Sequence, residues 1–283
     1  MKKLLIVSGC VAALVATVAL ALPTVAHKAG LHPDYNGPTY KLPGKRALVI
    51  ATNHSVLTAP GETEGNATGV FMSELTHPYY TFLDGGMSVD VGSVKGGQVA
   101  IDPMSLNRIT KTGHEERYEQ DPVLQAKVEK SIAIADLDFA DYDIIFLAGG
   151  WGAAYDLGQS ELLGQKISQT YYASDEPIIG GVCHGVLGLI QARDRDGNLL
   201  IAGRTMTGVT DKQVKELGID ITPLHPETEL RKAGAKFEAA TAFRDMLATY
   251  VAVDQERRFV TGQNQNSGLE AAHVAMGILA ERS

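Results

Sequence analysis

The residues best suited to chemistry are Cys183 and His184, which lie next to each other in the segment PIIGGVCHGVLGLI (177–190). The apolar run before the cysteine predicts a buried parallel strand, and the apolar residues after it have helical spacing. The thiol therefore lies at a sharp strand-to-helix turn, as the serine does in a nucleophile elbow. A helix N-terminus beside the sulfur favours the thiolate, which is the reactive form. We expect a partly accessible thiol with a low pKa, and the alternative is a buried cysteine that acts as a small apolar residue.

The cysteine count sharpens this expectation. The chain has two cysteines, and Cys10 lies in the apolar N-terminal segment. If that segment is removed, Cys183 is the sole cysteine and no intramolecular disulfide can form. A lone thiol in an exported protein calls for a reason, which either catalysis or redox sensing supplies.

Residues 1–26 have the pattern of a secretory signal peptide. A short basic start precedes an uncharged apolar run over residues 4–22, and small residues then lead to a cleavage site after Ala26. We therefore expect an exported, periplasmic protein. The apolar run is long for a signal peptide, so an uncleaved inner-membrane anchor that tethers the protein is the alternative.

The rest of the chain predicts one domain that acts on small molecules. Residues 27–44 are rich in Pro, Gly, His and Tyr and form an N-terminal arm or linker, and residues 45–283 form a single α/β domain. The net charge of −8 and the lack of a basic cluster argue against nucleic-acid binding. We expect a small-molecule substrate and a homodimer.

Strand and helix patterns alternate along this domain. Apolar runs predict strands at 46–51, 88–93, 143–148, 177–182 and 258–262, and helical spacing is found at 68–83, 121–130, 161–173, 226–233 and 266–281. Such alternation predicts a mainly parallel sheet covered by helices on both faces, a three-layer flavodoxin-like sandwich. Functional loops should gather at the C-terminal ends of the strands.

Several blocks in order resemble the ThiJ/PfpI superfamily, which has the type 1 glutamine amidotransferase-like fold. They are TGVFMSELTHPYYTFLDGG, GGQVAIDPMS, DYDIIFLAGGWGAAYDL, IIGGVCHGVLGLI, GRTMTGVTD and VTGQNQNSG. The resemblance runs from Arg46 to Glu281, and it is closest to the branch that contains chaperone-type glyoxalase III enzymes.

The resemblance implies a role for each matching residue. Cys183 would be the nucleophile, and Glu74 would hydrogen-bond the thiol as a carboxyl group that shuttles a proton. His184 would carry a proton. The backbone N–H groups of Gly150 and His184 would stabilise an oxyanion.

The chain departs from the family pattern at two positions. Trp151 stands where glyoxalase-type members carry a histidine, and we expect its ring to line the pocket. The position of the family's acid partner for the histidine is Val214 by count. Asp211 and Glu216 flank it and are the candidate substitutes, because a catalytic histidine needs an orienting acid. His54, at the end of the first strand, is a further candidate for the pocket wall.

We expect neither a metal nor a cofactor. His225, Glu227 and Glu229 have spacing that suits a metal, but acidic residues are also favoured in the first turn of a helix. The sequence thus predicts a cofactor-independent cysteine enzyme that acts on small reactive carbonyls. Glyoxalase III-like conversion of methylglyoxal to lactate is the most concrete version, and deglycation or amide hydrolysis are related ones. The alternative is a non-catalytic redox sensor or holdase chaperone in which Cys183 is oxidised.

Overall fold

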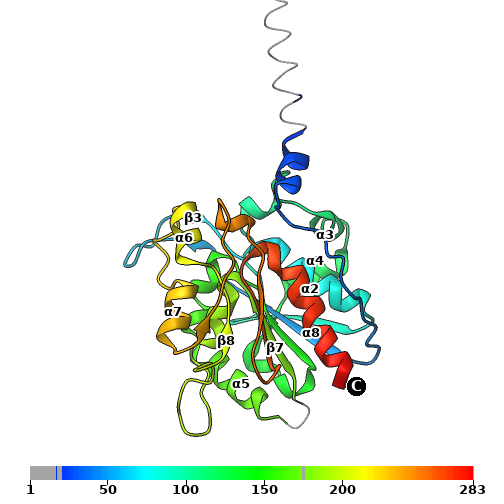
Figure 1. The fold of residues 1–283 in the computed structure, drawn as a ribbon, viewed down its shortest axis with the longest axis vertical. Coiled ribbons are helices and arrows are strands. Elements are labelled where there is room, and N and C mark those ends of the chain that lie inside the picture. The colour runs from blue at the N-terminus through cyan, green and yellow to red at the C-terminus, as the bar shows by residue number, and fades with distance from the viewer. Residues whose placement is uncertain (1–16, 18–20, 174–175, 283) are drawn as a thin grey trace, which may run out of the picture.

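A seven-stranded sheet forms the centre of the molecule (Figure 1), in the order β10-β11-β7-β6-β1-β4-β5. Its strands are β1 (Arg46–Ala51), β4 (Ser88–Ser93), β5 (Ile132–Ala133), β6 (Ile144–Leu147), β7 (Ile178–Val182), β10 (Val251–Val253) and β11 (Phe259–Gly262). Neighbouring strands are parallel throughout, except for β10, which pairs antiparallel with β11 at the edge.

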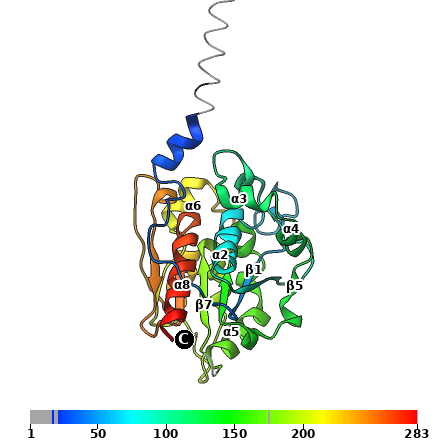
Figure 2. The same cartoon turned by 90° about the vertical axis from the view of Figure 1, so that its right-hand side faces the viewer.

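Helices cover both faces of this sheet because its strands are apolar on both sides. Along β1, Ala47 and Val49 belong to one buried cluster, whereas Leu48 and Ile50 belong to the other. The helices α2 (Met72–Asp84) and α8 (Gly268–Arg282) lie side by side on the first face (Figures 1 and 2). The helices α5 (Glu161–Tyr171) and α7 (Pro226–Lys232) contribute to the second cluster. The predicted three-layer α/β sandwich is therefore confirmed.

Shorter elements complete the fold. They are the helices α3 (Gly113–Tyr118), α4 (Pro122–Glu129) and α6 (Asp211–Leu217), the strand pairs β2 (Val56–Leu57) with β3 (Asn66–Ala67) and β8 (Thr205–Met206) with β9 (Lys236–Phe237), and the 3-10 helices η1 (Pro103–Leu106), η2 (Ile134–Asp136), η3 (Phe139–Asp141), η4 (Trp151–Ala154), η5 (Leu157–Gln159), η6 (Cys183–Leu189), η7 (Asp245–Leu247) and η8 (Gln265–Ser267).

Most predicted elements are present, with two informative differences. The helix predicted from residue 68 begins at Met72, because Val70 instead forms a parallel bridge with Ile101. The helix after Cys183 is a 3-10 helix of seven residues. The edge strand β10 and the helix α6 had no counterpart among the predicted elements.

The arm packs against the domain. Leu31 and Leu42 are 4% and 6% exposed, and the backbone N–H of Leu42 donates to the carbonyl of Gly85. Tyr35 stacks on His273 of α8, with ring centroids 4.0 Å apart. Residues 31–44 are thus part of the folded unit.

The structure, a computed structural model, describes residue 17 and residues 21–173 and 176–282. Most of the predicted signal peptide, residues 1–26, lies outside this description, so cleavage and anchoring remain predictions. Within the described ranges, no helix has the length and apolar character needed to cross a bilayer.

Candidate active site

The thiol lies at the turn between β7 and η6, at the C-terminal edge of the sheet. Cys183 has a φ of 58°, in the left-handed region that non-glycine residues rarely adopt. Such a conformation costs on the order of 1–3 kcal/mol and persists only where the surroundings enforce it. The predicted nucleophile elbow is therefore found in the backbone itself.

The structure brings Glu74 to this thiol. Glu74 lies in the first turn of α2, is 1% exposed and is hydrogen-bonded to Cys183. Among the described residues its Oε2 atom has no hydrogen-bond partner, and the backbone N–H groups of Gly149 and Gly150 are near enough to act on the pKa of the carboxyl group. A side chain at position 149 would overlap the Glu74 carboxyl oxygen, so glycine is required there. The carboxyl group, the thiol and the β6 loop thus form one closely fitted unit.

Burial controls the protonation states of the Glu74 carboxyl group and the Cys183 thiol. Burial raises the pKa of Glu74 to about 8, although its hydrogen bonds with Cys183 and the two glycines act in the opposite direction. Burial, followed by the nearby Glu74 carboxylate, raises the pKa of the Cys183 thiol well above its ordinary value. Two buried acids in contact resist carrying two charges at once.

The prediction of a partly accessible, low-pKa thiol is therefore wrong. Cys183 is 5% exposed, and the element after it is a short 3-10 helix. The neighbouring Glu74 carboxylate opposes the thiolate, an effect that the segment around the cysteine could not reveal.

His184 lies beside the sulfur. Its Nδ1 is 3.5 Å from the Cys183 Sγ, and its side chain is fully buried. Burial, with a smaller contribution from the charge of His225, lowers the pKa of His184 to about 3. The ring is therefore neutral at neutral pH and a weak base, and its closeness to the sulfur, not its pKa, is what suits the expected role as a proton carrier.

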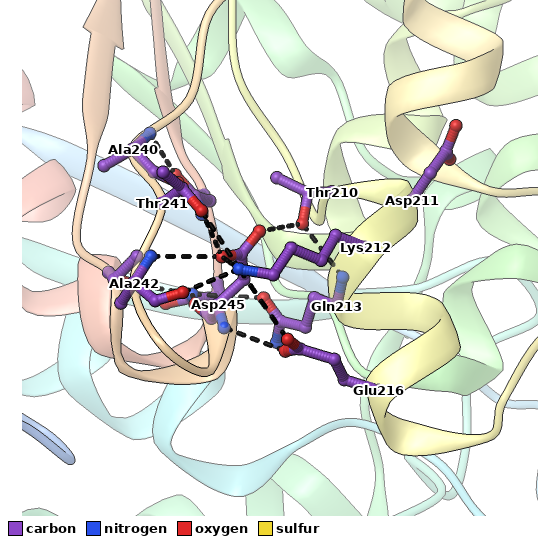
Figure 3. A network of polar contacts seen from close by, with 12 residues as sticks. Thr210, Asp211, Lys212, Gln213, Glu216, Ala240, Thr241, Ala242 and Asp245 are labelled. Carbon is purple, nitrogen blue, oxygen red and sulfur yellow. Dashed lines mark hydrogen bonds and ion pairs between the residues drawn. The ribbon is translucent and has the colours of Figure 1, made fainter.

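Neither candidate acid partner is hydrogen-bonded to His184. Asp211 points away from the contacts around Asp245 (Figure 3) and accepts hydrogen bonds from Thr228. Glu216 accepts from the backbone N–H of Asp245 (Figure 3). Among the described residues, the His184 Nε2 has no hydrogen-bond partner. The proposed substitution by Asp211 or Glu216 is thus wrong, because both carboxylates hold other parts of the fold.

Val214, the position matched to the family acid, is a buried apolar residue that is 1% exposed. The acidic residues of the suggested metal set are also engaged elsewhere. Glu227 pairs with Arg231, and Glu229 pairs with Lys232. Within the described part of the chain, no group of three or more His, Cys, Asp or Glu residues is arranged to hold a metal ion.

The predicted oxyanion donors converge on the sulfur. The backbone N–H groups of Gly150 and His184 both point to Cys183 and favour its charged form. Gly150 has a φ of +94°, and a Cβ there would overlap the backbone of Gly69 and Phe71. An oxygen bonded to the carbon that Cys183 attacks would lie within reach of these donors.

A pocket of about 160 Å³ opens beside the thiol. Trp151 lines it, as predicted. His54 does not line it, because its ring stacks on Tyr155 with centroids 4.0 Å apart. Most of the wall is apolar, and Glu74 and Asp102 are its acidic groups. The lining residues are Leu31, Phe71, Glu74, Asp102, Met104, Thr110, Gly150, Trp151, Cys183, His184, Val209, Gln213, Leu217, Ile219, Met246 and Gln265.

Four consecutive buried amide side chains, residues 263–266, hold in place the segments that provide Gln213 and Met246 to the pocket wall. Asn264 Nδ2 donates to the Gln213 side chain and to the carbonyls of Asp245 and Ala248. Gln265 Nε2 donates to the carbonyl of Met246. Sequence reasoning gives QNQN no role beyond its place in a family block, although four consecutive amides directly after a buried strand are a signal for such a run.

A charged network holds the same wall from outside (Figure 3). The Asp245 side chain, which is 3% exposed, pairs with Lys212 at 2.7 Å and accepts from Thr210 and Thr241 at 2.8 Å. Since Lys212 belongs to α6 and Asp245 to η7, the network joins the two elements that provide Leu217 and Met246 to the pocket.

Comparison with known proteins places this arrangement in a family. The DJ-1/PfpI family model matches residues 66–270, and the chain belongs to the DJ-1/PfpI family. The predicted ThiJ/PfpI resemblance is therefore confirmed.

Curated relatives are similar over most of their length. The glutathione-independent glyoxalase HSP31 of Saccharomyces cerevisiae is 30% identical over 236 residues, covering 81% of this chain and 95% of that protein. Glyoxalase 3 of Candida albicans is 29% identical over 232 residues, covering 76% of this chain and 93% of that protein.

Solved structures are also similar to this chain over most of its length. The Rapid Encystment Protein 24 kDa of Francisella tularensis matches with a TM-score of 0.75 and 30% identity, covering 83% of this chain and 99% of that one. Glyoxalase III of Candida albicans matches with a TM-score of 0.73 and 24% identity, covering 82% and 96%, and shows the same fold.

Proposed function

We propose that this protein is a glutathione-independent glyoxalase that converts α-oxoaldehydes, such as methylglyoxal, to 2-hydroxy acids. The observation that carries the proposal is the buried Glu74–Cys183 pair in the wall of a small, mostly apolar pocket. The names of the similar curated proteins support it.

The reaction begins with addition of the thiol to the aldehyde. A bond forms between the Cys183 sulfur and C1, and the thiol proton is transferred to the carbonyl oxygen, which gives a hemithioacetal. The N–H groups of Gly150 and His184 stabilise the charge that develops on this oxygen. His184, neutral and 3.5 Å from the sulfur, carries the proton.

The second stage moves hydrogen between the two carbons. The Glu74 carboxylate takes the proton from C1 to give an enediolate whose charge lies on the C2 oxygen. Glu74 then returns this proton to C2, and the proton of the C1 hydroxyl moves to the C2 oxygen. The product is a thioester of Cys183 with the 2-hydroxy acid. Water then cleaves the C1–S bond, which releases the acid and restores the thiol, so the net reaction is methylglyoxal plus water to lactic acid.

The pKa of Glu74 suits this role. A carboxyl group with a pKa of about 8 is a far stronger base, once ionised, than an ordinary glutamate. It also exists in both protonation states near neutral pH, which a group that first takes and then returns a proton requires.

The test is turnover of methylglyoxal without glutathione by three variants. Cys183→Ala should lose lactate formation entirely, and Glu74→Gln should lower kcat by at least about 100-fold. Glu115→Gln is the matched control, because Glu115 is equally buried but is bonded to Thr76 and Thr112, away from the thiol. Full activity of Glu74→Gln would remove Glu74 from the mechanism.

We further propose that the protein is exported, with the N-terminal sequence as the support. Mass spectrometry of the protein from its source cells should find a mature chain that begins at His27. An intact chain in the membrane fraction would indicate an uncleaved anchor. An intact soluble chain would contradict both cleavage of the signal peptide and anchoring.

A homodimer is likewise our proposal, which light scattering of the purified protein would test.

A further inference from the structure

We propose that Leu31 of the N-terminal arm is a specificity-determining residue, which closes the pocket and selects α-oxoaldehydes that carry an apolar alkyl or aryl group. The proposal rests on the proposed function. It concerns a segment that lies outside the part of the chain matched by the family model, residues 66–270.

Leu31 is built into the pocket wall. It is 4% exposed and lines the same pocket as Cys183 and Trp151. Its neighbours in the chain, Gly30 and His32, have φ values of 105° and 50°. The arm therefore makes a tight, defined turn at the point where this leucine enters the site.

One buried side chain fixes the backbone on both sides of Leu31. The N–H of His32 donates to the Asn266 Oδ1 at 2.7 Å, and the Asn266 Nδ2 donates to the carbonyl of Gly30 at 2.7 Å. Asn266 is 3% exposed and is the last residue of the amide run 263–266. The run that holds the other walls of the pocket thus holds the arm as well.

The imidazole of His32 adds a second attachment. It is 7% exposed and stacks on Phe71 with ring centroids 6.4 Å apart, and it meets His77 edge-on at 5.6 Å. Since Phe71 lines the pocket and caps α2, the arm packs directly against the element that carries Glu74.

The chemistry of the wall defines the substrate class. The aldehyde carbon must lie at Cys183, so the group on the second carbon faces the remaining wall, which includes Leu31, Met104, Leu217, Ile219 and Met246. Among the described residues no lysine or arginine lines the pocket, and its carboxyl groups are those of Glu74 and Asp102. An anionic substrate would find no cationic partner there, whereas an apolar group would lose its hydration and gain contact.

The experiment compares initial rates on methylglyoxal and phenylglyoxal for the purified wild type and three variants. Leu31→Ala should lower kcat/KM for phenylglyoxal about 10-fold, mainly through KM, and change that for methylglyoxal less than about 2-fold. Asn266→Ala, which frees the arm without altering a pocket residue, should shift specificity the same way.

Leu42→Ala is the matched control. Leu42 is an arm leucine of similar burial that packs in the core and does not line the pocket. Its ratio of phenylglyoxal to methylglyoxal turnover should equal that of the wild type. An equal loss on both substrates in Leu31→Ala, or no loss, would overturn the proposal.

A binding readout separates this proposal from the proposed function. Trp151 is the sole tryptophan of the chain and lines the pocket, so its fluorescence reports occupancy. In a Cys183→Ala background, Leu31→Ala should weaken binding of cyclohexyl methyl ketone about 10-fold and leave acetone unchanged. If the wild type converts neither aldehyde, the proposed function fails. Leu31-dependent ketone binding would then still support the arm as the wall of an apolar carbonyl site, and Leu31-independent binding would overturn it.

Discussion

Replacing Glu74 by Gln should change how the stability of the protein depends on pH. The ordinary pKa of this carboxyl group is 4.5, and burial raises it to about 8 in the folded protein. Between these values the unfolded chain has released the proton while the folded protein still holds it. Because the folded state binds more protons in this window, the free energy of unfolding falls as pH rises from about 4.5 to about 8.

The size of the effect follows from the same numbers. Each pH unit across the window is worth about 1.4 kcal/mol, so the wild type loses up to ~5 kcal/mol at the upper limit through this group alone. Glutamine has nearly the same shape but does not titrate. The stability of Glu74→Gln relative to the wild type should therefore increase by a few kcal/mol between pH 5 and pH 8.

Urea unfolding under reducing conditions at several pH values measures this difference. Buried acids that do not interact with Glu74, such as Glu115, affect both proteins equally and cancel in the comparison. Glu62→Gln is the control, because Glu62 is exposed and its replacement should leave the pH dependence unchanged. Parallel stability curves for wild type and Glu74→Gln would refute the assignment of a raised pKa to Glu74.

Three further predictions follow. Alkylation of Cys183 by iodoacetamide below pH 8 should be much slower than that of free cysteine, because burial and the Glu74 carboxylate raise the thiol pKa; Glu74→Gln should accelerate it at pH 8–9, and equal rates would contradict the coupling. Asp245→Asn should lower the free energy of unfolding by about 1–3 kcal/mol and raise KM, because it weakens the Lys212 pairing that holds the pocket wall; an unchanged urea midpoint would argue against this role. Trp151→His, which restores the residue typical of glyoxalase-type members, should raise methylglyoxal turnover by about 10-fold at most; loss of activity would mean that the indole itself serves this substrate.

The strands and the nucleophile could be predicted because their signals are local. β1 and β7 are continuous apolar runs, and Cys183 follows one of them directly. The helix α6 was missed because its signals, Thr210 as N-cap and Gly218 as C-cap, enclose only seven residues. The edge strand β10 has three residues and depends on pairing with β11.

The chemistry of the site depends on contacts between distant segments. The resemblance to the family placed Glu74 beside the thiol, but the direction of the Cys183 pKa depends on the burial of both groups. Asp211 and Glu216 lie close to Val214 in sequence, yet Asp211 is held by Thr228 and Glu216 by the backbone N–H of Asp245, and such long-range contacts cannot be read from the sequence. Leu31 lies more than 150 positions from Cys183 in the chain, and nothing in a loop sequence shows which wall it will complete.

The most direct test of the account is the product formed from methylglyoxal without glutathione. Equal amounts of wild type and Cys183→Ala are incubated with methylglyoxal, and lactate is quantified by chromatography against a no-enzyme control. The account predicts lactate in proportion to wild-type enzyme and background levels with Cys183→Ala. Equal lactate from both proteins, or loss of methylglyoxal without lactate, would contradict it.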